Sequence, residues 1–344
     1  MERTVIALVS GGLDSLLATR LMQLQGLEVY PVHLVSPWGC DEKAIENLER
    51  QIGQHVARIE KGTEYIGVVR NPIYGYGKNM NPCVDCRIFM FRRMVPLLRE
   101  LDAAAIVTGE VLGQRPMSQM RAQIRRIDRE SGLNGMVLRP LSAKLFPPTE
   151  AELRGIVERA LLYGFHGRGR TPQMALAAKL GLTEYSSPGG GCKLTTPGFT
   201  PKLRDFLAHY SDDDIIDATL LNYGRHFRLN DEVKLILGRD EEENRILERY
   251  VREHGENPAR YTAYMPESLT GPTALACGPI SDEADDLAGR AILRYSRAQE
   301  MPPEGHAIRV ISPTGERVIH ATQPLSREEA ASLRIGPHEL RLSP

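Results

Sequence analysis

Residues 1–21 read MERTVIALVSGGLDSLLATRL, and the glycine-rich stretch SGGLDS follows directly after an apolar run. The run TVIALV (4–9) is short and rich in β-branched residues, as a buried parallel strand should be. After SGGLDS, the segment LLATRLMQLQG carries apolar residues at helical spacing and ends at Gly26. A glycine-rich turn between a strand and a helix suits a phosphate, because backbone N–H groups and the positive end of the helix dipole face the anion. The stretch therefore predicts a phosphate-binding loop.

Each residue type in this loop has a place in that chemistry. Ser10, Gly11 and Gly12 supply the close turn, and Ser15 adds a hydroxyl in the first helical turn. Asp14 would repel a bare phosphate, but a Mg²⁺ ion that bridges the carboxylate and a phosphate explains its presence. The alternative is a tight turn in which Asp14 or Ser15 caps the helix. No G-x-x-x-x-G-K-[ST] motif lies near, and no G-x-G-x-x-G motif follows the strand.

Strands and helices alternate through the N-terminal part of the chain. Further strands are predicted at 29–35 and 104–109, strand-like pieces at 57–62 and 65–69, and helices at 41–56, 87–102 and 148–162. This alternation predicts an α/β fold, a doubly wound domain with a parallel sheet. Ligands bind beyond the carboxyl ends of the strands in such sheets, and both SGGLDS and TGE (108–110) fall there.

The pattern changes from about Phe199 onward. Two strand signals, FRLN (227–230) and VKLILG (233–238), precede the acidic helical stretch EEENRILERYVREH (241–254), and residues 305–321 predict a hairpin. These features indicate a smaller α+β domain. The predicted division is a nucleotide-binding domain at 1–175, a Gly-rich linker at 176–205, an α+β domain at 206–300, and a hairpin and helix segment at 301–344.

Bulk composition bounds the class of protein. The 344 residues are 42% hydrophobic and 25% charged with a formal net charge of -1, which is typical of a globular protein. No apolar stretch approaches the ~20 residues that span a bilayer, and the first residues do not resemble a signal peptide. We therefore expect a cytoplasmic protein with no membrane partner.

The five cysteines do not fit a disulfide scaffold, because their number is odd. Cys83 and Cys86 have CxxC spacing ahead of a helix, and Cys192 follows three glycines. Three thiolates on a [4Fe–4S] cluster would leave one iron open, whereas a structural Zn²⁺ needs four ligands and Cys40 is its only candidate fourth. A persulfide and disulfide relay without any metal is a further alternative, as is an ordinary helix start. Cys277 is interpreted as a packing residue.

SGGLDS after the first strand resembles the PP-loop of the ATP pyrophosphatases, whose pattern is SGGxDS. That family cleaves ATP between the α- and β-phosphates, and so adenylates an oxygen of its substrate. The resemblance implies ATP and Mg²⁺ as cofactors, with Asp14 holding the metal. It also implies that the nucleotide-binding residues are Ser10, Gly11, Gly12, Asp14 and Ser15.

The stretch VTGEVLGQRPMSQ (107–119) resembles the TGE/D-x-x-GQ-x-x-SQ segment of the 4-thiouridine synthetases. The matching residues are Gly109, Glu110, Gly113, Gln114, Ser118 and Gln119, of which Gly109 and Gln114 are expected at the nucleotide. A CxxC pair with one distant cysteine is similar to the sulfur-transferring branch, the tRNA thiouridine synthetases, and above all to its iron–sulfur-dependent members. This implies tRNA as a partner and Cys83, Cys86 and Cys192 as catalytic or metal-binding residues. The sulfur donor stays open between sulfide and a cysteine desulfurase persulfide, and a homodimer is one option.

Two further features indicate an RNA partner. Residues 87–126 carry eight arginines against three acids, and an arginine fork binds two phosphate oxygens at once. They are Arg87, Arg92, Arg93, Arg99, Arg115, Arg121, Arg125 and Arg126. The stretch VKLILGRDEEENRILE (233–248) resembles the core of the NFACT-R module. The alternatives are a solvated helix face for the arginines, and an oligomerisation or lid domain for the C-terminal part.

Together these features predict an ATP-dependent tRNA sulfurtransferase that adenylates a uridine carbonyl oxygen and replaces it with sulfur. The preferred version uses a [4Fe–4S] cluster on Cys83, Cys86 and Cys192. Its rivals are a cluster-free persulfide enzyme, an adenylating enzyme that inserts sulfur into a small molecule, and a non-catalytic RNA-binding factor.

Overall fold

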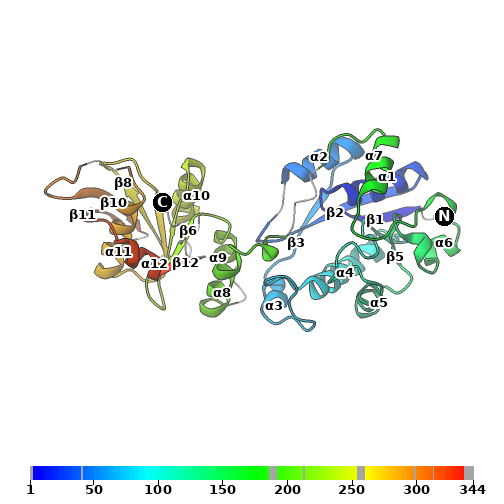
Figure 1. The fold of residues 1–344 in the computed structure, drawn as a ribbon, viewed down its shortest axis with the longest axis horizontal. Coiled ribbons are helices and arrows are strands. Elements are labelled where there is room, and N and C mark those ends of the chain that lie inside the picture. The colour runs from blue at the N-terminus through cyan, green and yellow to red at the C-terminus, as the bar shows by residue number, and fades with distance from the viewer. Residues whose placement is uncertain are drawn as a thin grey trace. The chain divides into compact units, whose positions relative to one another are not determined.

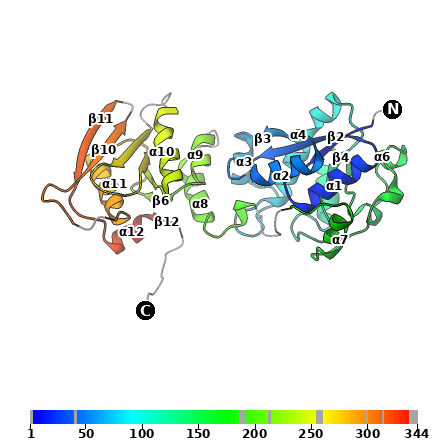
Figure 2. The same ribbon diagram turned by 90° about the horizontal axis from the view of Figure 1, so that it is seen from above.

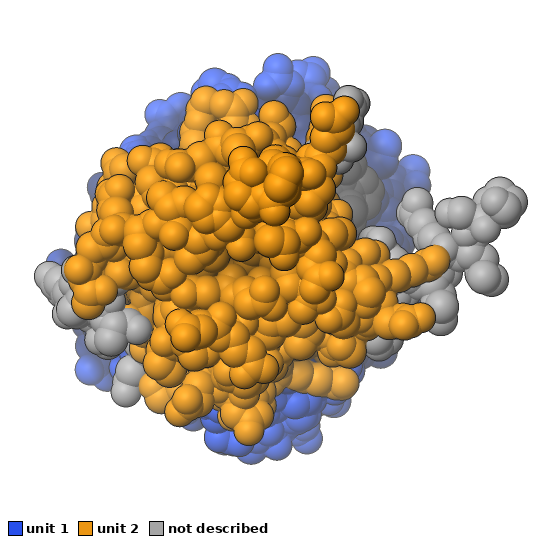
Figure 3. All heavy atoms as spheres, turned by 90° about the vertical axis from the view of Figure 1, so that its left-hand side faces the viewer, with its two compact units in different colours: residues 1–196 blue, residues 197–344 orange. Residues whose placement is uncertain are grey.

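The computed structural model describes residues 3–39, 42–185, 192–211, 214–253, 260–297, 300–312 and 314–336. The chain divides into two compact units, residues 1–196 and residues 197–344 (Figure 3). The domain boundaries predicted at 175, 205 and 300 stay predictions. None of the helices in the described ranges combines the length and the apolarity that crossing a bilayer requires.

The first unit is built on a five-stranded parallel sheet with helices on both faces (Figure 1). Its strand order is β3-β2-β1-β4-β5, with bounds Thr4–Leu8 (β1), Glu28–Val35 (β2), Ala57–Glu60 (β3), Ile106–Thr108 (β4) and Val137–Leu138 (β5). One face carries α1 (Leu13–Leu24), α2 (Glu42–Ile52) and α7 (Thr171–Lys179). The other carries α4 (Cys83–Glu100) and α5 (Arg121–Glu130), with α3 (Glu64–Arg70) against α4. The predicted doubly wound α/β fold is confirmed.

Alternating burial along β1 explains this arrangement. Val5 and Ala7 pack with the α1 face of the sheet, whereas Ile6 and Leu8 pack with the α4 face. β1 pairs with β2 on one side and with β4 on the other, so the strand order reverses beside β1. The crevice at such a switch point is where open α/β sheets bind ligands. SGGLDS follows β1 and Gly109 follows β4, so both lie at this crevice.

Two predicted elements are wrong. The segment 65–69 is not a strand but lies in α3, where Tyr65, Ile66 and Val69 bury one helical face. The helix predicted over 148–162 is only α6 (Glu150–Leu153), followed by a 3₁₀ turn at Arg159–Leu161. Gly155 has φ +70, which stops the helix after one turn.

The second unit is a seven-stranded antiparallel sheet in the order β11-β10-β8-β9-β7-β6-β12. The strands are Arg225–Arg228 (β6), Lys234–Leu237 (β7), Tyr261–Pro266 (β8), Ala274–Cys277 (β9), His306–Ser312 (β10), Gly315–Ala321 (β11) and Arg334–Ile335 (β12). α9 (Ile215–Leu220) and α10 (Glu241–Glu253) cover one face, and α11 (Asp282–Arg294) and α12 (Arg327–Leu333) cover the other. The predicted hairpin at 305–321 is β10 and β11, at the edge of the sheet in Figure 2. α8 (Thr200–His209) precedes α9, and the α+β prediction is confirmed.

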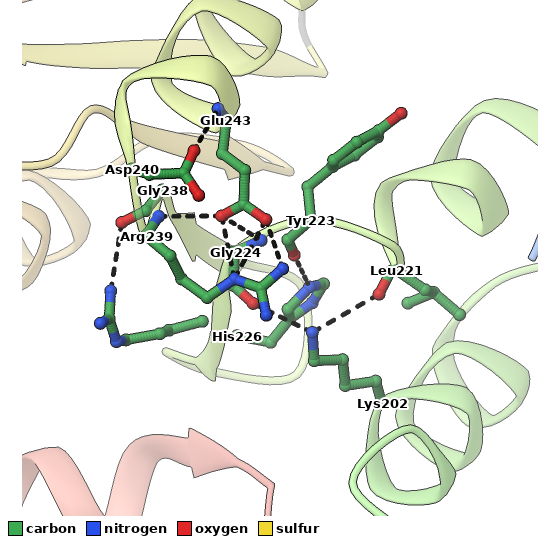
Figure 4. Close-up of polar contacts among 10 residues, drawn as sticks. Lys202, Leu221, Tyr223, Gly224, His226, Gly238, Arg239, Asp240 and Glu243 are labelled. Atoms are coloured by element: carbon green, nitrogen blue, oxygen red, sulfur yellow. Dashed lines mark hydrogen bonds and ion pairs between the residues drawn. The ribbon is translucent and has the colours of Figure 1, made fainter. Parts of the chain in front are cut away.

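A buried polar network fixes α10 against β6 and β7 (Figure 4). The Glu243 carboxylate accepts the backbone N–H groups of Gly224 at 3.2 Å and Arg239 at 2.9 Å. Burial alone would raise the pKa of Glu243, but the Arg239 guanidinium and these N–H groups lower it. Lys202 Nζ donates to the Gly224 carbonyl at 3.0 Å, which ties α8 to the same turn. The ionised Glu243 carboxylate therefore has hydrogen-bond partners inside the unit, and its role is to stabilise the fold.

Candidate functional site: a nucleotide loop beside three cysteines

The nucleotide loop, residues 10–15, is held in shape by its own hydrogen bonds. Gly11 has φ +73, and a Cβ there would lie 2.7 Å from the Ala44 Cβ, so only glycine fits. The Ser15 hydroxyl accepts the Ser10 N–H at 3.2 Å and donates to the Gly12 carbonyl at 2.8 Å. The first N–H groups of α1 have no carbonyl partner within the helix and face outward from its N-terminus. This geometry suits a phosphate and agrees with the predicted loop.

Asp14 is held from two sides. Its Oδ2 accepts Gln114 Nε2 at 3.0 Å and lies 3.5 Å from an Arg170 guanidinium nitrogen. Its Oδ1 is buried and has no hydrogen-bond partner among the described residues. A carboxylate with one oriented oxygen and one unused buried oxygen suits a divalent cation, because Mg²⁺ binds carboxylate oxygen.

The TGE segment (108–110) packs against the backbone of the nucleotide loop. A Cβ on Gly109 would lie 2.4 Å from the Asp14 carbonyl carbon, so the two backbones touch. Glu110 is buried and pairs with Arg87 Nε at 3.2 Å and Arg139 Nε at 2.9 Å. Burial favours the neutral acid, but these two guanidinium groups outweigh it and lower the pKa of Glu110. Gly109 thus supports the nucleotide loop, and Glu110 ties α4 to Arg139.

The CxxC pair opens α4. Asp85, between the two cysteines, accepts the backbone N–H of Ile73 at 2.8 Å and so fixes the preceding loop. The Cys86 sulfur accepts the Tyr65 hydroxyl at 3.1 Å and lies 3.5 Å from Lys61 Nζ. Both groups donate hydrogen bonds to this sulfur, which is an arrangement that suits a thiolate or another anionic sulfur species.

Cys192 comes to the same place from far along the chain. Its thiol interacts electrostatically with Cys86, Lys61 and Cys83. The residue as a whole is exposed, yet the surrounding protein keeps water from the sulfur and raises the pKa of Cys192 to about 11. Asn79 Nδ2 donates to the Thr195 carbonyl at 2.6 Å, which anchors the segment. The Cys192 thiol therefore lies within electrostatic range of Cys83 and Cys86.

No group of three or more His, Cys, Asp or Glu side chains is already arranged to hold a metal ion within the described ranges. The three glycines before Cys192, and Cys40, lie outside the described residues. Their predicted roles, like the predicted sulfur donor and homodimer, stay predictions.

The predicted arginine surface divides into two groups. Arg87 is used inside the unit, in the ion pair with Glu110. On α4, Arg92 donates to the Glu130 carbonyl, and on α5, Arg121 donates to the Leu145 carbonyl at 2.8 Å. Both side chains are nevertheless exposed, as are Arg93, Arg99 and Arg125. α4 and α5 thus carry exposed arginines, of which Arg92, Arg93 and Arg121 also make contacts within the unit.

Sequence reasoning missed Lys61, Tyr65 and Arg170. Lys61 and Tyr65 lie in the segments predicted to be strand pieces, and Arg170 lies in a glycine- and arginine-rich stretch before the predicted linker. The density of arginine at 168–170 was a usable signal. Nothing local marked Lys61 or Tyr65.

Cys277 belongs to a different place. It is buried and lines a pocket of about 310 Å³ formed by residues of the second unit, including Tyr210, Arg228 and Arg260. Burial raises the pKa of its thiol, which agrees with the packing role predicted for it. The pocket contains none of the nucleotide-loop residues.

Two family models match the chain, one in each unit. Residues 1–144 match the family described as thiamine biosynthesis protein (ThiI), and residues 224–334 match the NFACT protein RNA binding domain. The first unit is therefore similar to the ThiI family, and the second unit is similar to the NFACT RNA binding domain. Both predicted resemblances are confirmed.

Individual relatives agree with the first of these domains. A probable tRNA sulfurtransferase of Thermococcus kodakarensis is 34% identical over 119 residues, which are 32% of this chain and 30% of that protein. One from Methanothermobacter thermautotrophicus is 32% identical over 147 residues, 40% of this chain and 36% of that protein. The chain thus spans about a third of the length of these relatives. A solved 4-thiouridine synthetase–RNA complex with bound ATP covers 64% of this chain and 53% of its own, at 21% identity and TM-score 0.34.

Proposed function

We propose that the chain is an ATP-dependent tRNA sulfurtransferase that adenylates a uridine carbonyl oxygen and replaces that oxygen with sulfur. The observation that carries the proposal is the meeting of a PP-loop and three cysteines within one unit. Adenylation needs the first and sulfur delivery needs the second. The curated relatives of the first domain bear the name of this activity.

The nucleotide loop would bind the phosphates of ATP. The N-terminus of α1 and the backbone of Gly11 and Gly12 would contact these phosphates. The unpartnered Oδ1 of Asp14 is the oxygen that would hold Mg²⁺, and Gln114 and Arg170 orient that carboxylate. Bound Mg²⁺ would neutralise charge on the phosphates.

The reaction then has two steps. The uridine oxygen attacks the α-phosphorus, and pyrophosphate leaves with the electrons of the broken P–O bond. Sulfur attacks the activated carbon of the base, and AMP leaves with the former carbonyl oxygen. In both steps the protein positions the reactants and neutralises negative charge.

We propose that Cys83, Cys86 and Cys192 hold a [4Fe–4S] cluster. Three thiols are the number of protein ligands that such a cluster takes, and binding it would require the three sulfurs to move closer together than they are in this structure. A bound cluster would leave one iron open to sulfide. Lys61 and Tyr65 hydrogen-bond to the Cys86 sulfur and would stabilise its negative charge. Asp85 fixes the start of α4, and so the spacing of Cys83 and Cys86.

The RNA partner would be held by two surfaces. The NFACT-type domain is one. The exposed arginines of α4 and α5 are the other, on the helix that begins with the cysteines and on the helix beside it. Phosphate contacts of this kind make binding depend strongly on salt concentration.

Two measurements on the full chain test the proposal. Release of pyrophosphate from ATP should depend on added tRNA; release without tRNA would instead support an enzyme that adenylates a small molecule. Anaerobically purified protein should contain about four iron atoms per chain. Cys83→Ala and Cys192→Ala should each lose this iron, whereas Cys277→Ala, in the other unit, should keep it. Iron-free protein that still thiolates tRNA would favour the persulfide relay.

A further inference from the structure

One loop connects the nucleotide loop with the cysteines. This bridging loop, residues 109–120, packs Gly109 against the Asp14 backbone and gives Asp14 the Gln114 hydrogen bond at 3.0 Å. Further along, the Met117 side chain packs against Gly77: a Cβ added to Gly77 would lie 2.8 Å from the Cγ of Met117. Gly77 belongs to the segment that leads to Cys83. The bridging loop therefore touches both halves of the proposed site.

The middle of the bridging loop is fixed by its backbone. Gly113 N–H donates to the Gln119 carbonyl at 2.7 Å, and Gln119 N–H donates to the Arg115 carbonyl at 2.9 Å. This brace presents Arg115 as an exposed side chain. Its guanidinium interacts electrostatically with Cys83, Asp14 and Glu110. The Arg115 guanidinium is thus within electrostatic range of both the nucleotide loop and the CxxC pair.

Arg115 differs from the other arginines of the site. Arg87 and Arg139 pair with Glu110, and Arg170 pairs with Asp14. The Arg115 guanidinium makes no ion pair or hydrogen bond with any residue that the structure describes. Although the residue as a whole is exposed, the protein around the guanidinium excludes part of its water, and this desolvation together with repulsion from Arg87 lowers the pKa of Arg115. Asp14 and Glu110 act on its charge only from a distance, so among the described residues its N–H groups have no direct partner and can donate to an anion.

We propose that Arg115 binds the α-phosphate of the nucleotide. The inference rests on the proposed function for the position of the reaction. If the nucleotide loop holds the outer phosphates and sulfur is delivered from the cysteines, the α-phosphorus would have to lie between them, within reach of the bridging loop that carries Arg115. The α-phosphate oxygens stay anionic when the P–O bond to uridine forms and the bond to pyrophosphate breaks. They also stay anionic when AMP leaves, and the guanidinium fork matches two such oxygens.

The test compares two ligands that differ only in that phosphate. Dissociation constants for AMP and adenosine are measured by calorimetry on the full-length protein and on Arg115→Ala, Arg115→Lys and Arg50→Ala. Arg50 is the control, a surface arginine of α2 whose side chain is 65% exposed. Arg115→Ala should lose about 10- to 100-fold in AMP affinity and keep its adenosine affinity, as expected for one charged hydrogen-bond partner. Arg115→Lys should lie between, and Arg50→Ala should match the wild type.

Equal losses for AMP and adenosine, or no loss for either, would overturn the proposal. Unchanged AMP affinity with weaker binding of tRNA would also overturn it, by assigning the guanidinium to RNA. The experiment distinguishes failure of the Arg115 assignment from failure of the proposed function. If Arg115→Ala loses AMP selectively while the wild type transfers no sulfur to tRNA, Arg115 keeps its assignment and the sulfurtransferase proposal fails.

Discussion

The nucleotide loop and the cysteine group are built in opposite ways. The loop is one contiguous stretch between β1 and α1, shaped by hydrogen bonds among Ser10, Gly12 and Ser15. The cysteine group joins the start of α4 to Cys192, and its donors Lys61 and Tyr65 come from a third segment. The first depends on local backbone geometry, and the second on the packing of the whole unit. Substitutions should therefore separate the two.

Glu110→Gln should have the largest effect, because Glu110 is buried and pairs with two arginines. It leaves Arg87 without its carboxylate and removes one of two partners of the buried Arg139, which costs about 3–5 kcal/mol of unfolding free energy. Urea denaturation measures this loss. The ion pairs lower the pKa of Glu110, so its contribution is present above the ordinary value of 4.5 and is lost as pH falls below it. The unfolding free energy of the variant should therefore fall less steeply at acid pH than that of the wild type. A loss of unfolding free energy below about 1 kcal/mol would contradict the structural role of Glu110.

Asp14→Asn should break the nucleotide half alone. Removing the proposed Mg²⁺ ligand should slow tRNA-dependent pyrophosphate release on the order of 10²–10³-fold. The iron content should stay at the wild-type level, since Asp14 lies outside the cysteine group. Asp286→Asn, an exposed acid of α11, is the matched control. Loss of iron together with activity would show that the two halves are not separable.

Gly109→Ala tests the contact beneath the loop. Its Cβ would meet the Asp14 carbonyl carbon at 2.4 Å, so the backbone must shift at a cost of about 1–3 kcal/mol. Gly169→Ala is the control, because nothing lies within 4 Å of its Cβ. Thermal unfolding of the two variants should differ clearly. Equal melting temperatures would mean that the close approach is relieved without strain.

Tyr65→Phe should give the smallest effect. It removes only the hydroxyl that donates to the Cys86 sulfur at 3.1 Å, which is worth about 0.5–1.5 kcal/mol. ATP affinity, measured by calorimetry, should not change. If the variant lost more free energy of ATP binding than free energy of unfolding, Tyr65 would act at the nucleotide loop and not at the cysteines.

The same contrast explains what the sequence can predict. SGGLDS, β1 and α1 follow from local periodicity and glycine chemistry, and the structure agrees. The prediction that Cys192 acts with the CxxC pair came from the three glycines before it and from the resemblance to the tRNA thiouridine synthetases, not from the spacing of the cysteines. Residues 65–69 were misassigned because a short apolar run fits a strand or a buried helix equally well. Lys61 and Tyr65 gain their roles only through packing, which no local pattern encodes.

Mass spectrometry of tRNA nucleosides tests the central claim most directly. Unmodified tRNA is incubated anaerobically with the protein, ATP, Mg²⁺ and sulfide, then digested and analysed for thiolated uridine. We predict a thiolated uridine that requires ATP and is lost in both Asp14→Asn and Cys83→Ala. Thiolation that survives in either variant, or pyrophosphate release with no sulfur in the tRNA, would contradict a single site made of the loop and the cysteines.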